Sequence, residues 1–249
     1  MVLASLVVVS QLRTVNVQNN YGIDVSSHNG KIKWSEVRKD GVSFALIRCG
    51  GRSYASAGRL YEDEEFKRNL RLAHRNGMNV GVYFYSQATT KEEAVEEAQM
   101  VLEHIRGKTL ELPVFLDVED TETGGKGRAD GLTIEQRDEV VNAFCDTIRK
   151  KGYQAGVYSN RWYLTHKMNV ASFHKNTKIW VAEYHDGETP KYDGKWDYWQ
   201  YSMKGEVSGI DGPVDLDRYP SRRARTTTRT AESRETTGKV TDKNSKSAK

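Results

Sequence analysis

The sequence has only two cysteines, Cys49 and Cys145, among 249 residues. Two cysteines are too few for a disulfide framework or for a cysteine-built zinc site. Each lies on the apolar face of an expected strand or helix, so we expect both to be buried free thiols. The sequence also lacks metal-binding, phosphate-loop and dinucleotide-binding motifs. We therefore expect neither a metal nor a cofactor.

Apolar runs long enough to cross a membrane are absent as well. The run over residues 2–9 is far shorter than the roughly 20 apolar residues that a membrane span needs. It has the character of a signal-peptide core with cleavage after Ser10, but no basic residue precedes it. An artificial leader or a surface strand fits equally well. We expect residues 1–20 to form an N-terminal extension outside the main domain.

Positive charge is confined to the end of the chain. The net charge is +4, but residues 221–249 alone carry +6, from nine Lys/Arg and three Asp/Glu, which leaves residues 1–220 at −2. The body therefore gives no indication of nucleic-acid binding. Residues 221–249 are rich in Thr, Ser, Arg and Lys and have no aromatic residue. We expect a disordered basic tail, because such a segment cannot bury enough apolar surface to fold.

Between residues 21 and 220, apolar strand patterns alternate with amphipathic helices. Thr90 and Thr133 are suited to cap two helices, with Glu93 completing a capping box at the first. Eight strands, the first five separated by helical segments, predict an α/β parallel barrel that is irregular near its end. A doubly wound open sheet is the alternative. The strands are expected at 21–26, 43–49, 79–85, 112–119, 154–159, 178–184, 196–201 and 214–217, and the helices at 34–39, 62–76, 91–105, 133–151 and 160–167.

The fourth expected strand ends in acidic residues. Side chains alternate along a strand, so Asp117 and Glu119 share one face, about 7 Å apart. Two carboxylates at the end of an apolar strand repel each other and are poorly solvated, which raises the pKa of one and leaves the other ionised. This pairing suits general acid catalysis, although a strand running into an acidic surface loop has the same pattern.

Polar and aromatic residues recur at the ends of the other expected strands. The carboxyl ends of barrel strands meet at one mouth, where the active sites of such barrels lie. Acids that accept hydroxyl hydrogens and rings that stack on sugars suit a polar, ring-shaped, neutral ligand, although each aromatic could equally be a core residue. The candidates are Asp24, Arg48, Tyr83, Tyr85, Tyr158, Trp180, Tyr184, Gln200, Asp215 and Asp217.

Seven segments occur in order over about residues 21–220: YGIDVSSHNG (21–30), GVYFY (81–85), LPVFLDVE (112–119), GVYSN (156–160), IWVAEY (179–184), WQY (199–201) and VDLD (214–217). Together they resemble those of the glycoside hydrolase family 25 lysozymes, the Ch-type N-acetylmuramidases. The resemblance implies an irregular, flattened TIM-like barrel with an incomplete helix ring. It also implies cleavage of the β-1,4 bond between N-acetylmuramic acid and N-acetylglucosamine in bacterial peptidoglycan. We expect a secreted or released monomer that acts outside the cell or in the cell wall.

The resemblance also implies roles for individual acids. Glu119 is the general acid that protonates the leaving oxygen, and Asp117 steadies either the oxocarbenium-like charge or the substrate's N-acetyl group. Asp24 and Asp215 are the flanking acids. The family often has Asn at the position of Asp217, so the division of roles between Asp215 and Asp217 stays open. The spacing of Asp117 and Glu119 leaves open whether the second group attacks directly, activates water or assists the N-acetyl oxygen.

Two other functions stay open from the sequence. An N-acetylglucosaminidase or chitinase-like barrel also has an acid-rich fourth strand, and a barrel that only binds glycan needs no catalytic acid. Arg48 either pairs with Asp24 or Asp117 and holds it ionised, or forms an ordinary interior ion pair. The basic tail either holds the chain near anionic wall polymers or is a solvated terminus.

Overall fold

A computed structural model of the protein describes residues 20–55, 57–121 and 126–220. The expected basic tail, and all but the last residue of the expected N-terminal extension, lie outside the described residues. Within these three ranges no helix combines the length and the apolar character that crossing a bilayer would require.

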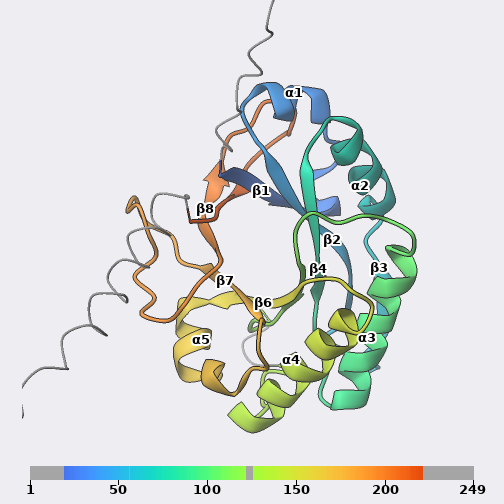
Figure 1. Ribbon diagram of the computed structural model, residues 1–249, viewed down its shortest axis with the longest axis vertical. Coiled ribbons are helices and arrows are strands. Elements are labelled where there is room, and N and C mark those ends of the chain that lie inside the picture. Colours follow the sequence, from blue (N-terminus) through green and yellow to red (C-terminus); the bar gives the residue numbers. More distant parts are fainter. Residues whose placement is uncertain (1–19, 56, 122–125, 221–249) are drawn as a thin grey trace, which may run out of the picture.

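Eight strands of the described chain close into a ring (Figure 1). The order around it is β1-β2-β4-β5-β6-β7-β8-β9, with β9 pairing back onto β1. These are the eight strands expected from the sequence, so the TIM-like barrel is confirmed. The bounds are β1 Tyr21–Val25, β2 Phe44–Arg52, β4 Asn79–Tyr85, β5 Val114–Asp117, β6 Ala155–Asn160, β7 Lys178–Ala182, β8 Tyr198–Gly205 and β9 Val214–Arg218.

The last strand runs against its neighbours, which corrects the expectation of a parallel ring. β9 is antiparallel to both β1 and β8, whereas the other ring pairs are parallel. Only residues 206–213 join β8 to β9, too few for the crossover that a parallel return needs. Because of this direction, Asp215 lies opposite Asp24, and Asp217 lies opposite Gly22, two residue pairs deeper along β1.

Helices cover only part of the ring. The longer ones are α2 Phe66–Arg75, α3 Lys91–His104 and α4 Ile134–Arg149, and the short ones are α1 Trp34–Lys39 and α5 Arg161–His166. The described chain has no helix after the 3-10 turn η2 Val170–Ser172, and loops instead flank β7 and β8 (Figure 1). The incomplete helix ring is therefore confirmed.

The capping residues behave as expected at one helix and differently at the other. Thr133 and Gln136 form a capping box at the start of α4. Thr90 caps α3 by accepting from the Glu93 N–H, but Glu93 does not complete a box. Its carboxylate accepts instead from the Thr89 N–H at 2.7 Å and pairs with Arg128 at 2.6 Å. A strong ion pair with the loop before α4 thus replaces the local bond.

Apolar side chains fill both sides of the strands. Outward-facing residues of the ring pack against the helices in one large core, which contains both free cysteines. Inside the ring lies a second cluster built largely from aromatic residues. The Trp180 ring lies 4.4 Å from that of Tyr158 and 5.2 Å from that of Phe115, measured between centroids. This packing fills the interior of the barrel with side chains.

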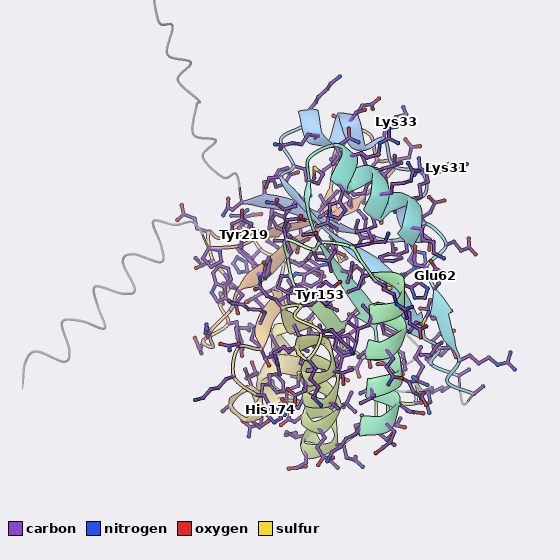
Figure 2. The ribbon with its side chains drawn as sticks, turned by 45° about the vertical axis from the view of Figure 1, so that its right-hand side comes forward. Lys31, Lys33, Glu62, Tyr153, His174 and Tyr219 are labelled. Atoms are coloured by element: carbon purple, nitrogen blue, oxygen red, sulfur yellow. The ribbon has the colours of Figure 1, made fainter. Side chains whose placement is uncertain are left out.

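One strand was not expected. β3, Leu60–Glu62, pairs antiparallel with the end of β2 and forms a hairpin outside the ring. Figure 2 shows Glu62 at the outer side of the molecule beside α3, where its carboxylate lies 3.1 Å from His104 Nε2. A strand of three residues, Leu-Tyr-Glu, has no alternation long enough to be recognised in a sequence.

Candidate active site

A cleft of about 830 Å³ opens at the carboxyl ends of the parallel strands. Ten of the twelve predicted site residues line it, and they come from all eight ring strands or the residues just after them. Tyr184 and Asp217 are the two that do not. The ten are Asp24, Arg48, Tyr83, Tyr85, Asp117, Glu119, Tyr158, Trp180, Gln200 and Asp215.

Asp117 and Glu119 both face this cleft. Asp117 is the last residue of β5 and pairs in register with Tyr85 of β4 and Tyr158 of β6. Its side chain is almost fully buried, and its Oδ1 has no hydrogen-bond donor within the described residues. Burial raises the pKa of Asp117 well above its usual range, and the charges of Glu119 and Asp24 raise it further. Asp117 therefore keeps its proton at a pH where an exposed aspartic acid is ionised.

Asp24 is fixed by an amide and two phenols. Gln200 Nε2 donates to Asp24 Oδ2 at 2.7 Å, while Gln200 Oε1 accepts from the hydroxyl groups of Tyr158 and Tyr184 at 2.9 and 2.7 Å. These two bonds define which end of the Gln200 amide faces Asp24. Tyr184 is thus half exposed outside the cleft, but its hydroxyl group holds a residue that lines it.

A second acid pair crosses from β1 to β9. Burial first, and then the charge of Asp215, raise the pKa of Asp24 to about 8, against the hydrogen bond from Gln200. Burial raises the pKa of Asp215 to about 6. The mouth of the barrel therefore keeps protons on carboxyl groups at a pH where exposed acids have lost them.

Asp217 lies beneath the cleft rather than on its surface. It is fully buried, and its Oδ1 accepts from Trp180 Nε1 at 2.8 Å. Burial, followed by the charge of Asp24, raises the pKa of Asp217 well above its usual range. Its other oxygen, Oδ2, is buried without a hydrogen-bond partner within the described residues, so the neutral, protonated form of Asp217 is favoured. The antiparallel direction of β9 places Asp215 at the mouth and Asp217 two residue pairs deeper.

Arg48 pairs with neither Asp24 nor Asp117. Its Nη2 lies 2.8 Å from Asp63 Oδ2, and its Nε donates to the same oxygen at 2.9 Å. Asp63 also accepts from the backbone N–H of Ser27, so the pair ties β2 to the turn after β1. The interior ion pair is therefore the interpretation that the structure supports. The positive charge still lowers the pKa of Asp117.

The described residues show no metal centre. No group of three His, Cys, Asp or Glu side chains within those ranges is arranged to hold a metal ion. The polar groups that line the cleft include carboxyl groups, phenols, the amides of Asn29 and Gln200, the imidazole of His28 and the guanidinium group of Arg48.

Comparison with known proteins agrees with this geometry. A model of the family described as glycosyl hydrolases family 25 matches residues 23–210. The autolytic lysozyme of Clostridium acetobutylicum is 30% identical over 198 residues, which are 80% of this chain and 55% of that protein. Lysozyme M1 of Streptomyces globisporus is 28% identical over 211 residues, covering 82% of this chain and 69% of that protein. The chain belongs to glycosyl hydrolase family 25.

Solved structures of similar proteins share the barrel. The bacterial lysozyme from Streptomyces coelicolor is 27% identical, with a TM-score of 0.67 over 82% of this chain and 94% of that chain. The modular autolysin LytC from Streptococcus pneumoniae is 30% identical, with a TM-score of 0.68 over 81% of this chain. The family 25 chain spans about half the length of LytC, 46%, and of the Clostridium lysozyme, 55%.

Several cleft residues of this family 25 chain were not predicted from the sequence. Tyr54 and Tyr61 come from the β2–β3 hairpin, and Met203 and Asp211 come from the β8–β9 hairpin. Tyr54 and Met203 are each about half exposed, so they form the rim. The segment 52–62 has two tyrosines between two glycines and an acidic run. That density of exposed aromatic residues in a loop is the one signal that could have suggested a ligand contact.

Proposed function

We propose that this chain is a peptidoglycan hydrolase that cleaves the β-1,4 bond between N-acetylmuramic acid and N-acetylglucosamine. One observation carries the proposal: acids from the first, middle and last ring strands converge in a single cleft. Asp24, Asp117, Glu119 and Asp215 all line it, between tyrosine and tryptophan side chains. Family membership and the printed names of the lysozyme relatives support the same reaction.

Glu119 acts as the general acid in this proposal. Glycoside cleavage needs one protonated acid at the leaving oxygen and a second group that balances the positive charge developing on the sugar. Glu119 follows β5 at the open side of the cleft, whereas Asp117 lies deeper at the strand end. Glu119 donates its proton to the leaving oxygen, and Asp117 faces the sugar ring or its N-acetyl group as the charge-balancing partner.

Asp24 and Asp215 flank the reacting sugar. Tyr158 and Tyr184 hold Gln200, and Gln200 holds Asp24, so this acid has one fixed orientation towards substrate hydroxyl groups. Tyr83, Tyr85 and Trp180 supply flat apolar walls against which sugar rings pack. We also propose that the protein acts where peptidoglycan lies, in the cell wall or outside the cell, and that it acts as a monomer without nucleic-acid partners.

The test is the identity of the new reducing end. Purified peptidoglycan is digested, the ends are reduced with borohydride, and the fragments are analysed by mass spectrometry. We expect the reduced sugar to be muramic acid. A reduced glucosamine would replace the proposal by an N-acetylglucosaminidase, and a digest without new reducing ends would leave only a glycan-binding barrel.

A further inference from the structure

A groove of about 590 Å³ lies beside the cleft, on the outer face of the β8–β9 hairpin. Residues 184–187 form one wall, and residues 201–205 with Leu216 and Arg218 form the other. This is the part of the ring that carries no helix within the described chain. The groove and the cleft meet at Met203, which lines both and is half exposed.

The charge of the groove is opposite to that of the cleft. The cleft is lined by six carboxylic acids, and its one arginine, Arg48, is paired with Asp63. The groove has Arg218 and Lys204 against a single acid, Asp186. Neither cation makes an ion pair with an acid anywhere in the described ranges. Two adjoining surfaces with opposite charge indicate a ligand whose parts differ in charge.

The guanidinium group of Arg218 lies over two aromatic rings. Its guanidinium carbon lies 3.9 Å from the centroid of the Tyr201 ring and 5.1 Å from that of Trp199. Stacking leaves the planar edge of the guanidinium group available, and that edge matches a carboxylate with two parallel hydrogen bonds. Strand alternation explains the placement, because Arg218 and Trp199 are paired on the outer face while Gln200 and Asp217 point inward.

We propose that this groove binds the peptide arm of peptidoglycan through a free carboxylate, with Arg218 as the main contact and Lys204 as a second positive charge. The proposal rests on the muramidase function above. Peptidoglycan carries short peptides with free carboxylates on its muramic acid residues, so a neutral glycan in the acidic cleft and an anionic peptide in the groove fit the two surfaces. Tyr184 and Met203 offer the peptide an apolar path between them.

The test compares three forms of one substrate, all free of anionic wall polymers: glycan strands with their peptides, strands whose peptides an amidase has removed, and peptide-bearing strands whose carboxylates are amidated. We expect R218Q to lower kcat/KM on the peptide-bearing strands with free carboxylates by roughly fivefold, mainly by raising KM. On the other two substrate forms, R218Q should lower kcat/KM by less than about twofold. K204Q should show a smaller loss with the same pattern.

Controls separate binding from folding and from the activity itself. R71Q removes an exposed arginine of α2 that lines neither the groove nor the cleft, and it should leave kcat/KM unchanged on all three substrate forms. R218K keeps the charge without the planar fork and should fall between wild type and R218Q. Equal losses of kcat/KM on all three substrates for both R218Q and K204Q, with unchanged thermal unfolding, would overturn the proposal that the groove binds the peptide. The muramidase function would be unaffected by that result. A wild type that cuts none of the three would overturn both.

Discussion

A single buried carboxyl group links activity to stability in this barrel. Asp24 is almost fully buried, and burial and the charge of Asp215 raise its pKa to about 8. The folded protein holds this proton more tightly than the unfolded chain does, so the stabilisation is complete below about pH 4. It is lost progressively as the pH rises towards 8. The site thus keeps a group that lowers stability at the neutral pH where it works.

The Asp24→Asn variant tests this linkage. Asn keeps an oxygen that accepts from Gln200 Nε2 but carries no charge at any pH. We compare the free energy of unfolding of D24N with that of wild type at two pH values. The difference, variant minus wild type, should be at least about 1 kcal/mol larger at pH 8 than at pH 4.5, which corresponds to about 2 to 4 °C in Tm. Activity should fall. D193N, at an exposed acid, should show no such trend, and a D24N variant whose relative Tm drops with pH would refute the linkage.

Asp217 is a second residue whose protonation decides its role. Its Oδ1 accepts from Trp180 Nε1 at 2.8 Å, and burial raises its pKa well above the usual range. Asn keeps the oxygen that accepts from Trp180 and carries no charge, so D217N should keep kcat/KM within about threefold and keep its Tm. D217A loses this bond and should lose roughly tenfold in kcat/KM. An Asn variant as impaired as the Ala variant would show that Asp217 acts through its charge instead.

At the level of elements, a buried ion pair fastens α3 to the catalytic end of the barrel. Arg52 of β2 donates from Nε to Glu97 Oε1 at 2.9 Å, and the Ser86 hydroxyl group donates to Glu97 Oε2 at 2.7 Å. The backbone N–H of Ser86 in turn donates to the carbonyl oxygen of Asp117 at 2.9 Å. One helix residue thereby fixes the segment that follows β4 next to the end of β5.

Removing Glu97 should be costly for this reason. E97A leaves Arg52, which is 4% exposed, buried without its main partner, and we expect a loss of about 3 kcal/mol in the free energy of unfolding. E96A is the matched control, because Glu96 also pairs with Arg52, at 3.0 Å, but its side chain is 57% exposed. We expect less than about 1 kcal/mol there. Urea unfolding measures the free energy of unfolding of both variants. Similar losses in E97A and E96A would contradict the role given to Glu97.

For the whole molecule, the sequence is enough to predict the ring and most of the cleft. The alternation of residues 112–119 and of the other strands places the candidate acids at strand ends, and ten of twelve candidates line the cleft. The direction of β9 was not predicted, because the expected strand end at residue 201 leaves residues 202–213 as the connection, about the length that a crossover needs, whereas β8 extends to Gly205 and leaves only residues 206–213. That direction decides that Asp215 reaches the mouth and Asp217 does not.

Contacts between segments far apart in the sequence could not be predicted either. Arg48 has several acids within reach along the chain, and only the folded hairpin shows that Asp63 is the partner. The rim residues Tyr54 and Met203 lie in the β2–β3 and β8–β9 hairpins, where no periodic pattern indicates orientation. Strand periodicity predicts which face a residue takes, whereas loop geometry decides what that residue meets.

The most direct test of Glu119 as the general acid is the catalytic activity of the Glu119→Gln variant on purified cell walls. Gln has nearly the same shape but no proton to give to a leaving oxygen. We expect kcat/KM to fall on the order of a hundredfold or more, with the Tm unchanged within about 2 °C. E188Q, at an exposed acid away from the cleft, should clear the walls at the wild-type rate. An E119Q variant that clears them as fast as wild type would contradict the account.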